Sequence, residues 1–270
     1  MFLCIFAEKI KGYKMKYLEE MHRLKVFHKK EVVALMKKGN ENVAKEILRR
    51  YKKQGLIAQI RRDLYAATDL AAKSCLASKF EIACHITPSS CLAYHAALEY
   101  HGLAHQVFYL LSVFSRETFQ NFEYDGISYI FCPFQSEAGV VCPVTDTLIR
   151  VTDLERTMLD CINRIDLCGG LEELIQCFAI ITYISEVKLL DYLDCINKQF
   201  LYQKTGFILS YFQKEMKLSE YFFQYCKSKI GKSTRYLTDK RESDTYFKDW
   251  KLCAPQNILS YLEQEGVEYV

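Results

Sequence analysis

Hydrophobic positions near the start of the chain recur at the spacing of an α-helix. This periodicity predicts helices over residues 17–24, 30–37 and 41–54. Gly39 and Asn40 supply a turn before the last of these helices, and Gly55 ends it.

The predicted helix over residues 41–54 has one apolar and one polar face. Its apolar stripe comprises Val43, Ile47, Leu48 and Tyr51. The opposite face is cationic and carries an amide, and its members are Asn42, Lys45, Glu46, Arg49 and Lys53. Such a face suits a polyanion, but it is equally typical of a helix whose basic side is simply solvated.

A hairpin is expected directly after Gly55. Two short β-prone runs, residues 56–60 and 64–67, are separated by Arg61, Arg62 and Asp63, which places two arginines at the tip. Helices followed by a basic-tipped β-ribbon are the layout of a winged helix-turn-helix, in which the third helix enters the major groove. Arginine pairs with guanine edges or phosphates, and asparagine reads adenine. The predicted DNA-binding residues are therefore Asn42, Lys45, Arg49, Lys53, Arg61 and Arg62.

Beyond this unit the pattern predicts strands first and helices later. Strands are expected over residues 106–114, 122–124, 127–131, 140–144 and 148–151, with Asp125-Gly126 as a hairpin turn. Helices are expected over residues 91–103, 152–165, 185–193, 200–209 and 218–229. Thr152 with Glu155 predicts a capping box, and Ser185 a further N-cap. The predicted fold class is α+β, with an N-terminal winged helix-turn-helix and a larger α+β domain of a small sheet and C-terminal helices.

The expected domain boundaries follow from this division. Residues 1–70 form the DNA-binding domain and residues 75–270 the second domain, with Thr68 to Ser74 as a plausible hinge. Residues 1–14 look like an appended segment, and Met15 is an equally good start of translation.

Composition narrows the class of protein. Of the 270 residues 50 % are hydrophobic and 26 % charged, and the low count of 11 Gly and 4 Pro favours a helix-rich globular chain over disorder. No apolar run approaches the length of a membrane span, and the apolar start is too short for a signal peptide. Twelve cysteines without framework spacing fit a reducing cytoplasm.

Charge is divided unevenly along the chain. Residues 1–67 hold 17 Lys and Arg against 7 Asp and Glu, a net +10, whereas the rest holds 19 against 26, a net −7. A polyanion-binding module fused to a different domain produces such an asymmetry.

The remaining candidate sites favour structure over chemistry. Cys91 and His95 are four residues apart, close to Cys84, His85, His101 and His105. No second ligand pair completes a four-ligand set, so no metal is expected. Arg156 and Asp160 have the spacing of a helical ion pair, and Glu186-Val187-Lys188 lacks the context of a nuclease motif. No phosphate-binding glycine loop or nucleophile elbow occurs, so neither an enzyme nor a cofactor is expected.

Several stretches resemble the AbiEi antitoxins of type IV toxin-antitoxin and abortive-infection systems. The resemblance is carried by residues 94–103 (YHAALEYHGL), 151–160 (VTDLERTMLD), 169–174 (GGLEEL) and 205–209 (TGFIL). Residues 54–65 resemble the family's wing, with Asp63 where the family usually has Gly. Asp tolerates a left-handed turn, so the wing should survive this departure.

The resemblance implies a cytoplasmic repressor that binds double-stranded inverted repeats upstream of its own operon. It further implies that the second domain counteracts a nucleotidyltransferase-like toxin without needing a stable complex with it. The alternative is a winged-helix regulator whose second domain senses a ligand or redox state through its cysteines. A nucleic-acid enzyme with an unfamiliar active site is a third interpretation.

Overall fold

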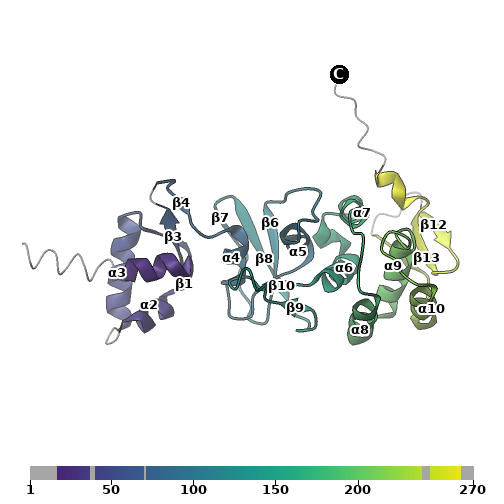
Figure 1. Ribbon diagram of the computed structural model, residues 1–270, viewed down its shortest axis with the longest axis horizontal. Coiled ribbons are helices and arrows are strands. Elements are labelled where there is room, and N and C mark those ends of the chain that lie inside the picture. Colours follow the sequence, from purple (N-terminus) through teal and green to yellow (C-terminus); the bar gives the residue numbers. More distant parts are fainter. Residues whose placement is uncertain (1–16, 37–39, 70, 239–243, 263–270) are drawn as a thin grey trace, which may run out of the picture.

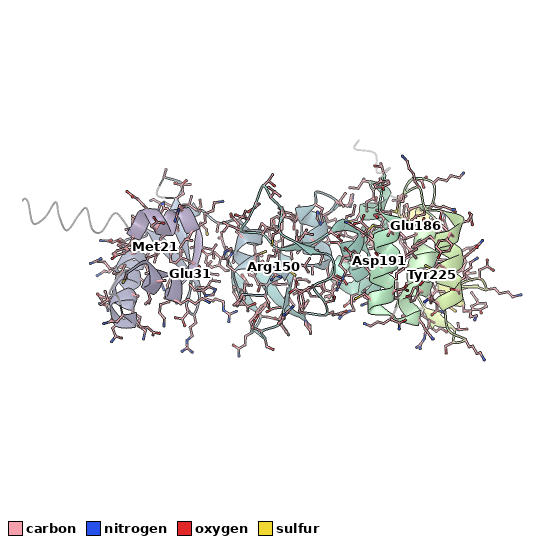
Figure 2. All side chains as sticks on the ribbon, turned by 60° about the horizontal axis from the view of Figure 1, so that its bottom comes forward. Met21, Glu31, Arg150, Glu186, Asp191 and Tyr225 are labelled. Atoms are coloured by element: carbon pink, nitrogen blue, oxygen red, sulfur yellow. The ribbon has the colours of Figure 1, made fainter. Side chains whose placement is uncertain are left out.

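The computed structural model describes residues 17–36, 40–69, 71–238 and 244–262. The fold is α+β, as the sequence predicts. The elements follow one another along the longest axis, from an N-terminal unit through a central sheet to a helical part that carries a small sheet (Figure 1). Figure 2 shows side chains projecting from the surface along the whole length.

The N-terminal unit, residues 17–69, contains the predicted helices and hairpin. After a helix over residues 17–24 the order is β1 (Val26–His28), α2 (Lys29–Leu35), α3 (Glu41–Lys53), β2 (Ile57–Arg61) and β3 (Leu64–Asp69). Strand β1, which the pattern does not predict, pairs with β3, so the sheet order is β1-β3-β2. Position 37 at the end of the predicted second helix, and Gly39 of the predicted turn, lie outside the described residues.

Side chains of α3 correct part of the predicted apolar stripe. Leu48 and Tyr51 are buried against the other helices, as expected. Val43 is 47 % exposed, and Ala44 is fully buried in its place. The small Ala44 lets α3 approach its neighbours closely, which turns the adjacent Val43 toward solvent.

The predicted hinge is a hairpin. Thr68 and Asp69 continue β3 and pair with β4 (Ser74–Cys75). One face of the N-terminal sheet covers its own helices, and the other contributes Val26, Ile60, Leu64 and Ala66 to a core shared with the central sheet. The two predicted domains are therefore joined by a packed interface.

The central sheet has six strands in the order β7-β8-β6-β5-β10-β9. Its strands are β5 (Cys91–Leu92), β6 (Leu110–Ser115), β7 (Phe122–Tyr124), β8 (Ile127–Pro133), β9 (Val140–Val141) and β10 (Val151–Thr152). It packs with α4 (Lys79–Cys84) and α5 (Tyr94–Tyr100). The predicted β7–β8 hairpin is confirmed, with positive φ at Asp125 and Gly126.

The strands expected over residues 140–144 and 148–151 are shorter than predicted, β9 ending at Val141 and β10 beginning at Val151. Two further predicted boundaries in this part are wrong. The helix expected from position 91 begins at Tyr94, because Cys91 and Leu92 form β5 with β6 and β10 on either side. The strand expected from position 106 begins at Leu110, because the backbone N–H groups of His105 and Gln106 donate to the Glu173 carboxylate. In each case a partner distant in sequence decides the conformation.

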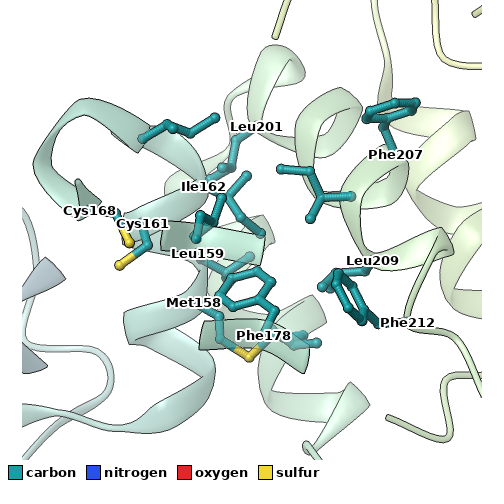
Figure 3. Close-up of a cluster of buried hydrophobic side chains, with 14 of the residues drawn as sticks. Met158, Leu159, Cys161, Ile162, Cys168, Phe178, Leu201, Phe207, Leu209 and Phe212 are labelled. Carbon is teal, nitrogen blue, oxygen red and sulfur yellow. The ribbon is translucent and has the colours of Figure 1, made fainter. Parts of the chain in front are cut away.

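The helical part contains most of the large core. Its helices are α6 (Leu154–Asn163), η1 (Ile165–Cys168), α7 (Leu171–Ala179), α8 (Glu186–Ile196), α9 (Gln199–Ser210) and α10 (Glu220–Lys229). Buried side chains of α6, α7 and α9 meet in this core, among them Met158, Phe178 and Leu201 (Figure 3). Figure 3 also shows Cys161 and Cys168 side by side at its edge.

A second, three-stranded sheet follows the helices. It consists of β11 (Arg235–Tyr236), β12 (Asp244–Phe247) and β13 (Leu252–Pro255) in the order β11-β13-β12, before η2 (Ile258–Leu262). The expectation that strands lie early and helices late is thus incomplete. Among the described residues no helix is long and apolar enough to cross a membrane.

The predicted cap of α6 is also corrected. Asp153 is the N-cap, and its carboxylate accepts the backbone N–H of Arg156 at 3.0 Å. Thr152 belongs to β10, and its hydroxyl bonds Thr157 instead. Ser185 caps α8 as predicted.

Candidate nucleic-acid interface

The polar face of α3 is presented to solvent. Asn40 begins the helix, its side chain accepting the N–H of Val43 at 3.0 Å, and buried Leu48 and Tyr51 fix its rotation. The predicted residues on the opposite side, Asn42, Lys45, Arg49 and Lys53, are all exposed. We call these four residues the α3 face.

Two side chains next to the α3 face affect its charge. Glu46 pairs with Arg49, and Lys52 adds a cation. Glu46 lies 3.4 Å from the guanidinium of Arg49, whose side chain is 82 % exposed. Lys52, which the sequence prediction omits, is also exposed and donates to Gln59 of β2 at 2.8 Å. In the sequence, only the net positive charge of residues 41–54 indicated that Lys52 could belong to this surface.

The turn between β2 and β3 adds one exposed cation. Asp63 has a φ of +62°, which confirms the predicted left-handed turn at this position. Arg62 next to it has a side chain that is 95 % exposed. Lys29 ties the turn to the helices: its N–H donates to the Asp63 carbonyl at 3.0 Å, and its ammonium lies 3.3 Å from Glu41. Hydrogen bonding to Glu41 raises the pKa of Lys29, which therefore stays charged.

Arg61 does not join this surface, and its predicted exposure at the hairpin tip is wrong. Its guanidinium carbon lies 5.0 Å from the ring centre of Phe122 and 5.7 Å from that of Phe119, both in the central part. A register shift between Gln59 and Arg61 redirects the end of β2. The side chain thus lies between the two sheets, where one guanidinium nitrogen is buried without a hydrogen bond.

The structure separates the histidines and cysteines that the sequence groups together. Cys84 bonds the Arg150 carbonyl and His101 the Thr152 carbonyl, whereas His95 and His105 lie at the Glu173 carboxylate. This buried carboxylate accepts from His95 at 3.0 Å and from the Cys177 thiol at 3.3 Å. Burial opposes its ionisation, but the hydrogen bonds from Gln106 and His95 lower the pKa of Glu173 below its ordinary value. The described residues hold no group of His, Cys, Asp and Glu arranged to bind a metal ion.

Most cysteines of the predicted redox alternative are buried, whereas Cys142 and Cys195 are exposed. All cysteines in the described part of the chain are free thiols. Burial raises the pKa of Cys84 to about 12, and that of Cys91 to the same value. The reactive thiolate form of these two buried thiols is therefore scarce at neutral pH.

Arg156 and Asp160 form the predicted ion pair, and both are buried. The guanidinium Nε lies 2.9 Å from the Asp160 carboxylate, and another of its nitrogens donates to the Ala138 carbonyl at 2.8 Å. Burial raises the pKa of Asp160 to about 6, although Arg156 acts in the opposite direction. The pair has no access to solvent, so its role is to hold the loop before β9 against α6.

Glu155 and the Glu186-Val187-Lys188 stretch are occupied by contacts between helices. Glu155 is not part of a capping box; it accepts the N–H of Ser185 at 2.8 Å. Glu186 accepts from the N–H and hydroxyl of Ser219, and Lys188 lies 3.1 Å from Asp153.

Comparison with known proteins finds a similar fold but no matching family. No family model and no curated protein matches the sequence. Among solved structures, the crystal structure of RV2827C protein from Mycobacterium tuberculosis is similar, with a TM-score of 0.58 and 12 % sequence identity. The match covers 88 % of this chain and 88 % of that one, so the likeness in fold extends over most of both chains.

Proposed function

We propose that the N-terminal unit is a winged helix-turn-helix that binds duplex DNA. The order helix, β1, α2, α3, β2, β3, with β1 beside β3, is the order of that motif. Helix α3 takes the place of the recognition helix and the β2–β3 hairpin that of the wing. The observation that carries the proposal is the exposure of the α3 face on this helix.

The chemistry of the α3 face suits base edges in the major groove. Asn42, Lys45 and Arg49 follow one another at spacings of three and four and therefore share a side of the helix. Asparagine pairs with adenine and arginine with guanine, while the exposed Val43 suits a thymine methyl group. Lys53 and Arg62 are placed for phosphate contacts, which position the protein without reading sequence.

A mobility-shift titration of the full chain tests this proposal, with DNA from upstream of its operon at two salt concentrations. Arg49→Ala should weaken binding to the specific site by about 1–3 kcal/mol and relax its sequence preference. Affinity should fall steeply with salt, because each phosphate contact releases counterions. Arg164→Ala, which removes a 51 % exposed arginine of the helical part, is the matched control. Binding that is independent of salt, or equal loss in both variants, would reject the α3 face.

The cellular role that we propose is that of an AbiEi-like antitoxin. The protein represses its own operon through inverted repeats, and the part from residue 75 onward counteracts a nucleotidyltransferase-like toxin. The sequence resemblance supports this role. The buried ion pair Arg156–Asp160 and the His95–Glu173 contact in the part from residue 75 onward serve packing, which fits a role other than catalysis.

Paired assays of promoter repression and toxin rescue test the division of labour. Arg49→Ala combined with Arg62→Ala should abolish repression and leave rescue intact at equal protein abundance. Loss of rescue in this variant would contradict the division. The full chain is required, because the N-terminal unit shares a hydrophobic core with the central sheet.

A further inference from the structure

A second cationic region lies at the other end of the molecule. Residues 227–238 and 244–251 contain six Lys and Arg against two Asp and Glu, whereas residues 68–197 contain seven against 17. Residues from 68 onward are acidic overall, but this net charge includes one basic segment near the C-terminal end. This segment includes the end of α10 and the strands β11 and β12, which lie at the opposite end of the molecule from α3 in Figure 1.

The three-stranded sheet carries a row of aromatic side chains on one face. Tyr236 of β11 and Tyr246 of β12 both lie opposite Cys253 of the middle strand β13. Residues directly opposite each other point to the same side of a sheet, and adjacent strands are about 4.8 Å apart, so the two tyrosines are about 10 Å apart. Tyr236 is 42 % exposed and Tyr246 51 % exposed.

The other face of the same sheet is anchored in the core. Leu252 and Ala254, the neighbours of Cys253, are fully buried. Trp250 packs against Gly206 of α9, where an added Cβ would lie 2.2 Å from the indole ring. Gln203 of the same helix donates to the Trp250 carbonyl at 3.1 Å. The tyrosine row is thus presented on a rigid support.

Cations lie on the segments around this row. Lys232 precedes β11 and Lys248 follows β12, and both are exposed. Lysines beside exposed aromatic rings provide phosphate contacts and stacking surfaces together.

We propose that this face of the β11–β13–β12 sheet binds single-stranded nucleic acid, with RNA as the probe used to test it. Unpaired bases offer π-faces to the two tyrosines, and the phosphodiester backbone is attracted by the surrounding cations. A DNA duplex hides the faces of its bases inside the stack and does not fit a stacking row. An acidic protein would bind through the cations, and replacing the tyrosines would then change its affinity little.

Fluorescence anisotropy of the full chain with a 5′-labelled, unstructured 12-nucleotide RNA tests the proposal. Tyr236→Ala and Tyr246→Ala should each weaken binding about 5- to 100-fold, as expected for loss of one stacked base. The corresponding phenylalanine variants should bind within about twofold of the parent, because the ring and not the hydroxyl stacks. Tyr109→Ala removes a 73 % exposed tyrosine of the central part and should have no effect.

Further arms separate this face from the α3 face and from other ligands. Arg49→Ala should leave RNA binding unchanged, and the two tyrosine variants should leave duplex DNA binding unchanged. Single-stranded DNA of the same sequence should bind with similar affinity, because the bases and not the sugars stack, whereas duplex RNA should bind weakly. Ultraviolet cross-linking of the unmodified protein should place the RNA on Tyr236 or Tyr246, which keeps the test decisive if an alanine variant fails to fold. Cross-links elsewhere, or alanine variants that bind RNA like the parent, would overturn the proposal.

Discussion

Arg61 and Arg62 are adjacent in sequence and are expected to have separable roles. The sequence pattern assigns both to DNA. In the structure the Arg61 guanidinium lies over Phe122 and Phe119, whereas the Arg62 side chain is 95 % exposed. Arg61→Ala should therefore lower stability and leave DNA affinity unchanged, and Arg62→Ala should do the reverse.

The contacts of Arg61 set the size of the effect. Ring-centre distances of 5.0 and 5.7 Å are within the range of cation–π interactions. Such an interaction contributes about 0.5–1 kcal/mol when exposed and about 2 kcal/mol when desolvated. Because Arg61 is half-buried and one of its nitrogens lacks a hydrogen bond, we expect a loss of about 1–2 kcal/mol from the free energy of unfolding. A chain of this size should lose about 2–4 °C in Tm for each kcal/mol.

Thermal unfolding and mobility shift, measured on the same preparations, decide between the two roles. Arg61→Lys is an informative companion, because it retains the charge and loses the planar group that lies over the rings. A fall in DNA affinity for Arg61→Ala with no change in Tm would refute the assignment of Arg61 to the interface. An unchanged affinity for Arg62→Ala would remove the hairpin from the proposed DNA contacts.

Three further predictions concern the buried groups. Arg156→Ala should lower the free energy of unfolding by about 3–5 kcal/mol, because it leaves the Asp160 carboxyl buried without its partner. Urea titration at pH 7 measures this loss. A loss below about 1 kcal/mol would show that the site relaxes around the missing side chain. The folded-state pKa of Asp160, about 6, lies above its unfolded value of 3.8, so its contribution to stability should fall as the pH rises through this window. Subtracting the pH profile of Asp160→Asn isolates that slope, and an opposite sign would contradict the raised pKa. Gly206→Ala should cost about 1–3 kcal/mol, because its Cβ would overlap the Trp250 ring; an unchanged Tm would show that the indole can move away.

Local features of the sequence determined many of the elements. Helices α3, α8 and α10 show their apolar period directly, and the polar face of α3 follows from it. Asp125-Gly126 specifies its hairpin, and Ser185 its helix start, because each acts within a few residues of itself. The exposed members of the proposed DNA surface belong to this class, since a helix that buries Leu48 and Tyr51 must expose the residues opposite them.

Contacts between distant segments decided the rest. Strands β1 and β5 are too short to show a period. They form because Val26 pairs with Ala66 of β3 and Cys91 pairs with Phe114 of β6. Arg61 differs from Arg62 because the register shift in β2 directs it toward the aromatic rings of the central part. The tyrosine row on the C-terminal sheet arises because three separate segments pair in one register. Periodicity reports which face of an element is buried, but the partner that buries it is fixed only when the chain has folded.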